Sequence, residues 1–183
     1  MNKEEYTERF GIAYHEAGHS LSGFQHGHTT NFIDINLDPQ KKVYPNVDKS
    51  FGVDEPTINE IHNVDITALN QRNFNNVLEV AKRYCEGLLA GTMAEYWYLH
   101  KGNPKFEQIN KNDKCKVRNC INVIYKLSGN QLNRNDFLNE RMNNTRDFIC
   151  NTDNFNKIQK IANALMNSKN FRVEKELIEK LIK

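Results

Sequence analysis

Two histidines and a glutamate near the N-terminus, His15, Glu16 and His19, form the pattern HExxH. Residues four apart on a helix lie on the same face one turn apart, so both imidazoles can reach one metal ion. Imidazole nitrogens bind Zn²⁺ at about 2.0–2.1 Å. Glu16 is rotated away from the ligand face, where it can take the proton of a zinc-activated water that attacks a carbonyl. The pattern therefore predicts a zinc peptidase site with Glu16 as the general base.

So short a pattern also arises by chance on solvated helix faces, and its context decides between the two interpretations. Apolar residues around the motif recur at helical spacing and predict a buried stripe on a helix that ends near Gln25. These residues are Phe10, Ala13, Tyr14, Ala17, Leu21 and Phe24. A motif that lies inside a buried stripe favours a metal site over an ordinary solvated face.

A catalytic zinc site also needs a third protein ligand and an open position. Residues with suitable donor atoms are His26, His28, His62, Glu86, Glu95, His100, Glu107 and Asp113. The metzincin pattern requires Gly three and His six residues after the second histidine, and here Gly23 and His26 each stand one residue further on. On a continuous helix His26 would lie about 10.5 Å along the axis from His19, too far to share its metal.

Asp113 stands at the predicted start of a later helix. The helix macrodipole there favours a carboxylate and keeps it ionised, as a metal ligand must be. An aspartate at this position is equally typical of an ordinary helix cap. The residue by itself leaves both roles open.

Three motifs in the chain resemble those of the FtsH-type (M41) zinc peptidases. Ala13–Leu21, AYHEAGHSL, resembles the family signature AYHEAGHAL, and Leu88–Glu95, LLAGTMAE, resembles its LLGGRAAEE helix. Asn112-Asp113 falls where the family has its GAxNDL segment, and Ile158–Leu181 resembles the C-terminal helix pair. The resemblance covers most of the chain and implies a mainly helical metallopeptidase domain with a small sheet.

The resemblance also implies the site residues: zinc on His15, His19 and Asp113, with Glu16 as the general base. The chain departs from the family at Thr92 and Tyr96, where Arg and Glu are usual, and at Lys114-Cys115 after the aspartate. It contains no GxxxxGK[ST] motif, so the ATPase module of the family is missing from this sequence. These departures bear on hexameric assembly and the substrate channel more than on the metal.

The predicted fold is mainly α with a small β-sheet: a zincin-like active-site helix, an edge strand and a C-terminal helical bundle. Alternation predicts the strand over Phe32–Leu37. Its free edge can pair with an extended substrate, although a strand that merely completes a sheet fits as well. Residues 38–70 are expected to form a flexible flap that includes short strands. The proposed short strands are Lys42–Tyr44 and Phe51–Val53.

Helical periodicity dominates the rest of the chain. The predicted helices span Asn73–His100, Asn112–Leu127, Phe137–Ile149, Phe155–Met166 and Val173–Leu181. Gly91 lies inside the first of them at a cost of about 1 kcal/mol relative to Ala, which indicates a close approach by another helix.

Length and composition limit the remaining possibilities. At 183 residues we expect one peptidase-like domain, with a metal-site part over 1–130 and a C-terminal helical part over 131–183. A net charge of +2 gives no basic field for nucleic acid. The chain has no apolar run long enough for a membrane anchor and no signal peptide, which predicts a cytoplasmic protein. The four cysteines have no CxxC spacing and are expected to be reduced, mostly buried thiols.

These features together predict an ATP-independent zinc metalloendopeptidase that acts on polypeptides. The native-looking Met1 and the short acidic start favour a free-standing domain over a fragment. The alternative is a catalytically silent, zinc-stabilised module for protein interaction or regulation. An intact Glu16 argues against that alternative, because a structural zinc site needs no base. Oligomeric state is left open.

Overall fold

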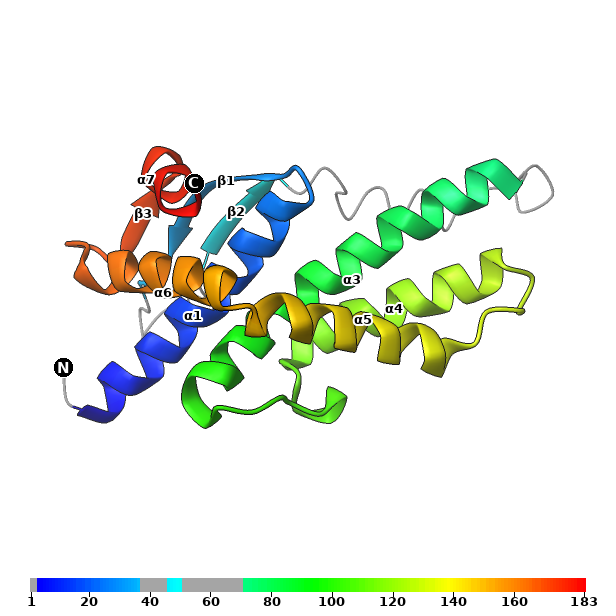
Figure 1. Cartoon of the computed structure of the whole chain (residues 1–183), viewed down its shortest axis with the longest axis horizontal. Helices are drawn as coiled ribbons and strands as arrows, with labels where there is room; N and C mark the ends of the chain where they lie inside the picture. The colour runs from blue at the N-terminus through cyan, green and yellow to red at the C-terminus, as the bar shows by residue number, and fades with distance from the viewer. Residues whose placement is uncertain (1–2, 37–45, 51–70) are drawn as a thin grey trace.

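The chain folds into a mainly helical structure with a small antiparallel sheet, as predicted (Figure 1). The computed structural model describes residues 3–36, 46–50 and 71–183, the side chains of 46–50 and 71–73 excepted. The helices are α1 (Lys3–Gln25), α3 (Gln71–His100), α4 (Lys111–Leu127), α5 (Arg134–Cys150), α6 (Thr152–Asn167) and α7 (Lys175–Ile182). The strands are β1 (Thr29–Asp34), β2 (Asn46–Ser50) and β3 (Arg172–Glu174), and a short 3-10 helix, η2, spans Phe106–Gln108.

The motif helix α1 is the centre of the fold and packs most extensively against α3. Gly18 marks the point of closest approach, because a Cβ atom there would lie 2.6 Å from the Ala90 carbonyl oxygen. The same atom would lie 2.8 Å from Cβ of Ala94. Only a residue without a side chain fits at this crossing, so glycine lets the backbones of α1 and α3 come together.

One continuous core joins these helices to the rest of the chain. Its buried members come from α1, α3, α4, α5, α6, α7, β1 and β3. Helix α6 packs on α1 and α5 packs on α3, so the C-terminal helices cover both halves of the central pair (Figure 1). None of the described helices has the length and apolar character needed to cross a membrane.

The motif helix α1 ends at Gln25, as predicted. It begins at Lys3, well before the predicted buried stripe that starts at Phe10. Ala13, Tyr14, Ala17 and Leu21 are buried as expected. Phe24, also placed in the stripe, is 38% exposed, because the last turn of α1 turns Ser22 and Gly23 inward instead.

The strand after the motif helix is not an edge strand. The strand order is β2-β1-β3, with β1 in the middle and antiparallel to both neighbours. It runs over Thr29–Asp34 rather than Phe32–Leu37, and Phe32–Asp34 pair on both sides. Its main chain there is already hydrogen-bonded to neighbouring strands, so the prediction that a substrate adds to its free edge is wrong.

The predicted last helix is also partly wrong. Val173 lies in β3, opposite Ile33, and α7 begins only at Lys175. Val173 and Ile33 are 3% and 0% exposed, so pairing with β1 buries two apolar side chains that a longer helix would place elsewhere. The predicted helices at 73–100, 112–127, 137–149 and 155–166 are confirmed, each slightly longer than its apolar pattern.

Two further predictions have different outcomes. All four cysteines are free thiols, as expected, but only Cys85 and Cys120 are buried, whereas Cys115 is exposed. The flap over residues 38–70, with its proposed strands Lys42–Tyr44 and Phe51–Val53, lies outside the described residues apart from β2. Strand β2 falls between the two proposed short strands.

The glycine crossing predicts that Gly18→Ala destabilises the protein by about 1–3 kcal/mol through overpacking. Gly11→Ala is the matched control on the same helix, because a Cβ there meets its nearest neighbour at an ordinary 3.5 Å. This second change should be neutral or stabilise by up to about 1 kcal/mol through better helix propensity. Urea unfolding measures both variants, and equal stabilities would contradict the close approach.

Candidate metal centre

Three donor atoms converge between α1 and the first turn of α4. Nε2 of His15 lies 3.0 Å from Nε2 of His19. The Asp113 Oδ2 atom lies 3.3 Å from the first of these nitrogens and 3.5 Å from the second. The three side chains are 10%, 2% and 13% exposed, respectively. The structure thus brings together the three residues predicted as metal ligands, from positions almost 100 residues apart in the chain.

The triangle of donor atoms has the size that a small cation requires. Ligands at about 2.0–2.1 Å on the corners of a tetrahedron lie about 3.3–3.4 Å apart, and the three observed separations scatter around that value. Asp113 Oδ2 is buried, and no group among the described residues donates a hydrogen bond to it. A buried anionic oxygen without a partner is costly unless a cation balances it. This donor set could therefore bind a metal ion.

The far sides of both imidazoles are held by acceptors on α3. Nδ1 of His15 lies 3.0 Å from Oε2 of Glu95, and Nδ1 of His19 lies 2.7 Å from the Gly87 carbonyl oxygen. Each Nδ1–H can donate to its acceptor, which leaves Nε2 with a free lone pair toward the donor triangle. Partners of this kind orient histidine ligands and increase their basicity in metal sites.

The electrostatics of the site favour positive charge. Burial by itself would lower the pKa of His15, but the nearby carboxylates of Asp113 and Glu95 raise that pKa to about 10. Burial would raise the pKa of Asp113, yet its interactions with the two imidazoles hold that pKa well below the usual range. The carboxylate therefore stays ionised, and the site attracts a cation, either a metal ion or a proton.

Gly91 makes room for the second histidine. A Cβ atom at this position would lie 2.4 Å from Nε2 of His19, so the imidazole fills the space that any other side chain would need. The sequence indicated a close helix approach at Gly91, and the structure confirms a close approach to α1 through the metal-ligand candidate His19.

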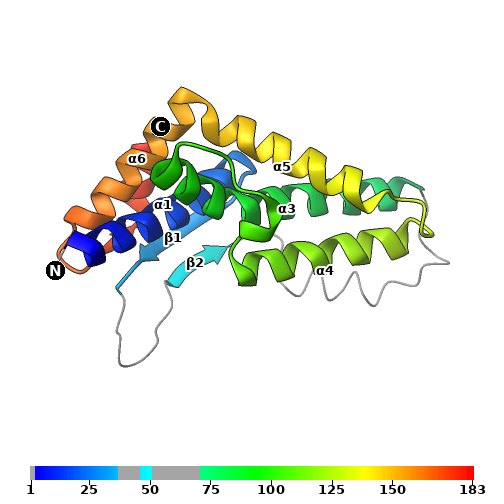
Figure 2. The same ribbon diagram turned by 90° about the horizontal axis from the view of Figure 1, so that it is seen from below.

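Asp113 is placed by the cap of its helix. Asn110 is the N-cap of α4, and its side-chain oxygen accepts a hydrogen bond of 2.9 Å from the Asn112 amide. The Asn110 amide in turn donates to Oγ1 of Thr92, 3.1 Å away on α3. Figure 2 shows α4 starting at the end of the connection that leads from α3. The hydrogen bond to Thr92 fixes the start of α4 to α3. The same helix supplies the acceptors for the two imidazoles of α1.

Thr92 and Gly87 are the site residues that sequence reasoning did not find. Thr92 stands where the resembled family has Arg, and its burial at 5% exposed was not visible from the sequence. Gly87 contacts His19 through its main-chain carbonyl, a group that every residue has, so the sequence could not indicate this role. Both lie in or beside the segment Leu88–Glu95 that the resemblance singled out.

The other candidate ligands lie elsewhere. Glu95 supports His15 rather than joining the donor triangle, and Glu86 binds Arg141, with Oε1 2.7 Å from Nη1. His26 lies 3.6 Å from the second Glu86 oxygen, and His100 packs on the Tyr96 ring.

In the part of the chain that the structure describes, His15, His19 and Asp113 form the one group suited to a metal. Glu107 lies on η2 and His28 follows α1, both outside this group, and His62 lies outside the described residues.

Glu16 is a buried carboxylate on the motif helix α1. It is 8% exposed and sits next to His15 on α1. No hydrogen bond or ion pair joins its carboxylate to another side chain among the described residues. Keeping a buried acid unpartnered costs stability, and the cost is consistent with a carboxylate kept free for chemistry.

Comparison with protein-family models found no match for this chain, and comparison with curated proteins found none either.

The donor triangle predicts that Asp113→Asn lowers zinc affinity at least tenfold, because the buried charge that balances the cation is removed. Asp136→Asn is the matched control: Asp136 holds the same third position in α5, after the N-cap Asn133, and should leave zinc binding unchanged. Competition with a chromogenic chelator measures both affinities. Equal affinity in Asp113→Asn and wild type would remove Asp113 from the ligand set.

Proposed function

We propose that this chain is an ATP-independent zinc metalloendopeptidase acting on polypeptides. The proposal is supported chiefly by one observation: Glu16, buried and without a side-chain partner among the described residues, directly follows His15, whose Nε2 atom converges with two other donor atoms. A site that only stabilises the fold needs the donors and has no use for the free acid. The resemblance to FtsH-type peptidases in the motif Ala13–Leu21 supports the same assignment.

His15, His19 and Asp113 would hold the zinc ion, and three protein ligands are the number found in catalytic zinc sites. Zinc bound there supplies Lewis acidity, which lowers the pKa of water toward about 7 and polarises a carbonyl. The burial of the ligands strengthens these electrostatic effects, because charges interact more strongly away from water.

Glu16 acts as the proton carrier in the proposed reaction. Its carboxylate accepts a proton from the attacking water as the C–O bond to the scissile carbonyl forms. The protonated acid then donates that proton to the amine nitrogen as the C–N bond breaks. Because no other side chain among the described residues occupies the carboxylate, both transfers can use it without first breaking a protein hydrogen bond.

Glu95 and Gly87 hold the imidazoles in place during these steps. Their contacts with the two Nδ1 atoms fix the ring orientations. Preorganised ligands avoid rearrangement at the moment of reaction. A cytoplasmic location and operation without an ATPase module belong to the same proposal.

The proposed role of Glu16 predicts that Glu16→Gln lowers kcat on an unfolded protein by about 10²–10⁴-fold. Zinc content should be unchanged, because the ligands remain. The folded state should be as stable as wild type or more so, since a buried unpartnered charge is removed.

Glu8→Gln, an exposed change two turns earlier on α1, serves as the matched control and should keep full activity. Casein cleavage, elemental analysis and thermal unfolding supply the three readouts. Cleavage by Glu16→Gln at the wild-type rate would rule out the proposed base, and zinc binding without cleavage of any tested protein by wild type would favour the silent module.

A further inference from the structure

The positive charge of the chain is concentrated in one segment. Residues 101–118 hold six of the 25 basic residues and two of the 23 acidic ones, so the rest of the chain is net negative. One of the two acids is Asp113, whose carboxylate faces the imidazoles. The segment connects α3 to α4 and includes the first turns of α4, so the local excess of positive charge surrounds the third ligand candidate.

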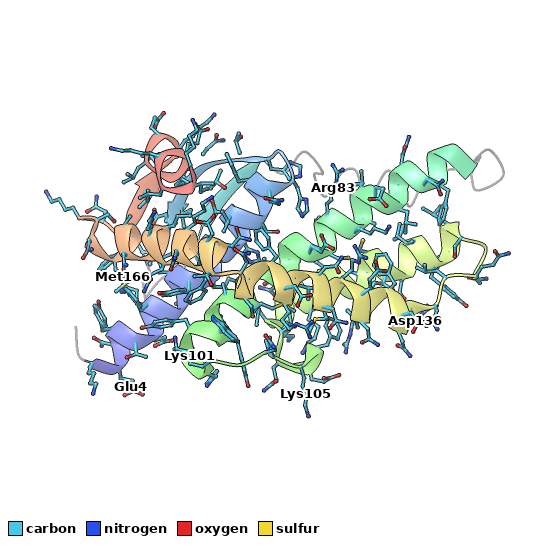
Figure 3. All side chains as sticks on the ribbon, viewed as in Figure 1. Glu4, Arg83, Lys101, Lys105, Asp136 and Met166 are labelled. Atoms are coloured by element: carbon cyan, nitrogen blue, oxygen red, sulfur yellow. The ribbon has the colours of Figure 1, made fainter. Side chains whose placement is uncertain are left out.

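Four members of this segment form what we call the basic surface: Lys105, Lys111, Lys114 and Arg118. Lys105, Lys111 and Arg118 are exposed, and Lys114 is half-buried. Figure 3 shows Lys105 at the edge of the molecule, on the opposite side of α1 from the sheet. Lys114 Nζ donates to the Glu107 carbonyl oxygen at 2.7 Å, and the Arg118 guanidinium lies 5.4 Å from the centre of the Phe106 ring. Both α4 side chains therefore reach toward η2, the 3-10 helix next to Lys105.

The four members of the basic surface have no ion-pair partner among the described residues. Some basic residues elsewhere do have acidic partners: Lys82 pairs with Glu79, Arg141 with Glu86, and Lys157 with Asp153. Within the described residues, the basic surface thus gathers four positive charges without an ion-pair partner on one short stretch of the chain.

The field reaches the candidate metal centre. Lys111 and Lys114 lie in the same helical turn as Asp113, and Arg118 lies about 7.5 Å further along the axis of α4. The Debye length at physiological salt is about 8 Å, so charges at these separations act together. A polypeptide that approaches the donor triangle along α4 would pass through this field.

We infer that the basic surface binds an acidic stretch of the polypeptide substrate, which rests on the proposed peptidase function. Aspartate and glutamate side chains that flank the scissile bond pair with Lys105, Lys111, Lys114 and Arg118. A positively charged surface of this kind increases the association rate of an acidic substrate and selects partners whose charge is complementary. The substrate class is accordingly unfolded or flexible segments rich in acidic residues. The position of the surface around the third ligand candidate favours a polypeptide over nucleic acid.

The test separates binding from cleavage. Zinc-loaded full-length Glu16→Gln protein is titrated with two labelled, disordered peptides of equal length, one with a block of glutamates and one with glutamines in their place. Fluorescence anisotropy at low salt should show about tenfold tighter binding of the glutamate peptide. That preference should fall to less than about twofold at 0.5 M salt, where the Debye length is only a few ångströms.

Adding Lys111→Gln and Lys114→Gln should remove most of the preference with zinc content unchanged, since glutamine keeps a donor for the Glu107 carbonyl. Lys157→Gln with Lys160→Gln on α6 is the matched control and should keep the preference. Equal binding of the two peptides, or a preference that survives the α4 substitutions, would overturn the inference. Tighter binding of a single-stranded oligonucleotide, with displacement of the glutamate peptide, would also overturn it. Cleavage of either peptide by wild type reports on the peptidase function separately.

Discussion

The close contact of α1 with α3 is the constraint on which the rest of the site depends. Gly18 lets the two backbones meet, and Gly91 gives the His19 imidazole the space of a missing side chain. Once the helices are this close, the Gly87 carbonyl and the Glu95 carboxylate fall within reach of the two Nδ1 atoms. The two glycines therefore determine both how closely the helices pack and how the imidazoles are oriented.

The site is built with charge that the protein alone does not balance. Within the described residues, Asp113 Oδ2 is buried without a hydrogen-bond donor, and Glu16 is buried without a side-chain partner. Both arrangements oppose folding, because buried acids lose hydration. A bound cation would offset the first cost. The cost of burying Glu16 is expected for an acid that accepts and releases a proton in the proposed reaction. The Thr92–Asn110 hydrogen bond keeps the costly carboxylate in place by fixing the start of α4 to α3.

Local patterns in the sequence predicted most of the helices and the site on α1. The spacing of His15 and His19 is a property of one helix, and helical periodicity needs no partner to be recognised. The central position of β1 and the pairing of Val173 with Ile33 depend on segments about 140 residues apart, so alternation alone could not show them. Asp113 needed the family resemblance, because its residue type fits a helix cap equally well. Thr92 was missed for a related reason: its partner is a main-chain amide on another element.

The metal centre is tested most directly by X-ray absorption at the zinc edge of the zinc-loaded protein. We expect one zinc per chain in a shell of nitrogen and oxygen atoms only, at about 2.0–2.1 Å, with the multiple-scattering signal of two imidazoles. Sulfur at about 2.3 Å would instead place the metal on cysteines. That result, or a protein that takes up no zinc, would contradict the assignment of His15, His19 and Asp113.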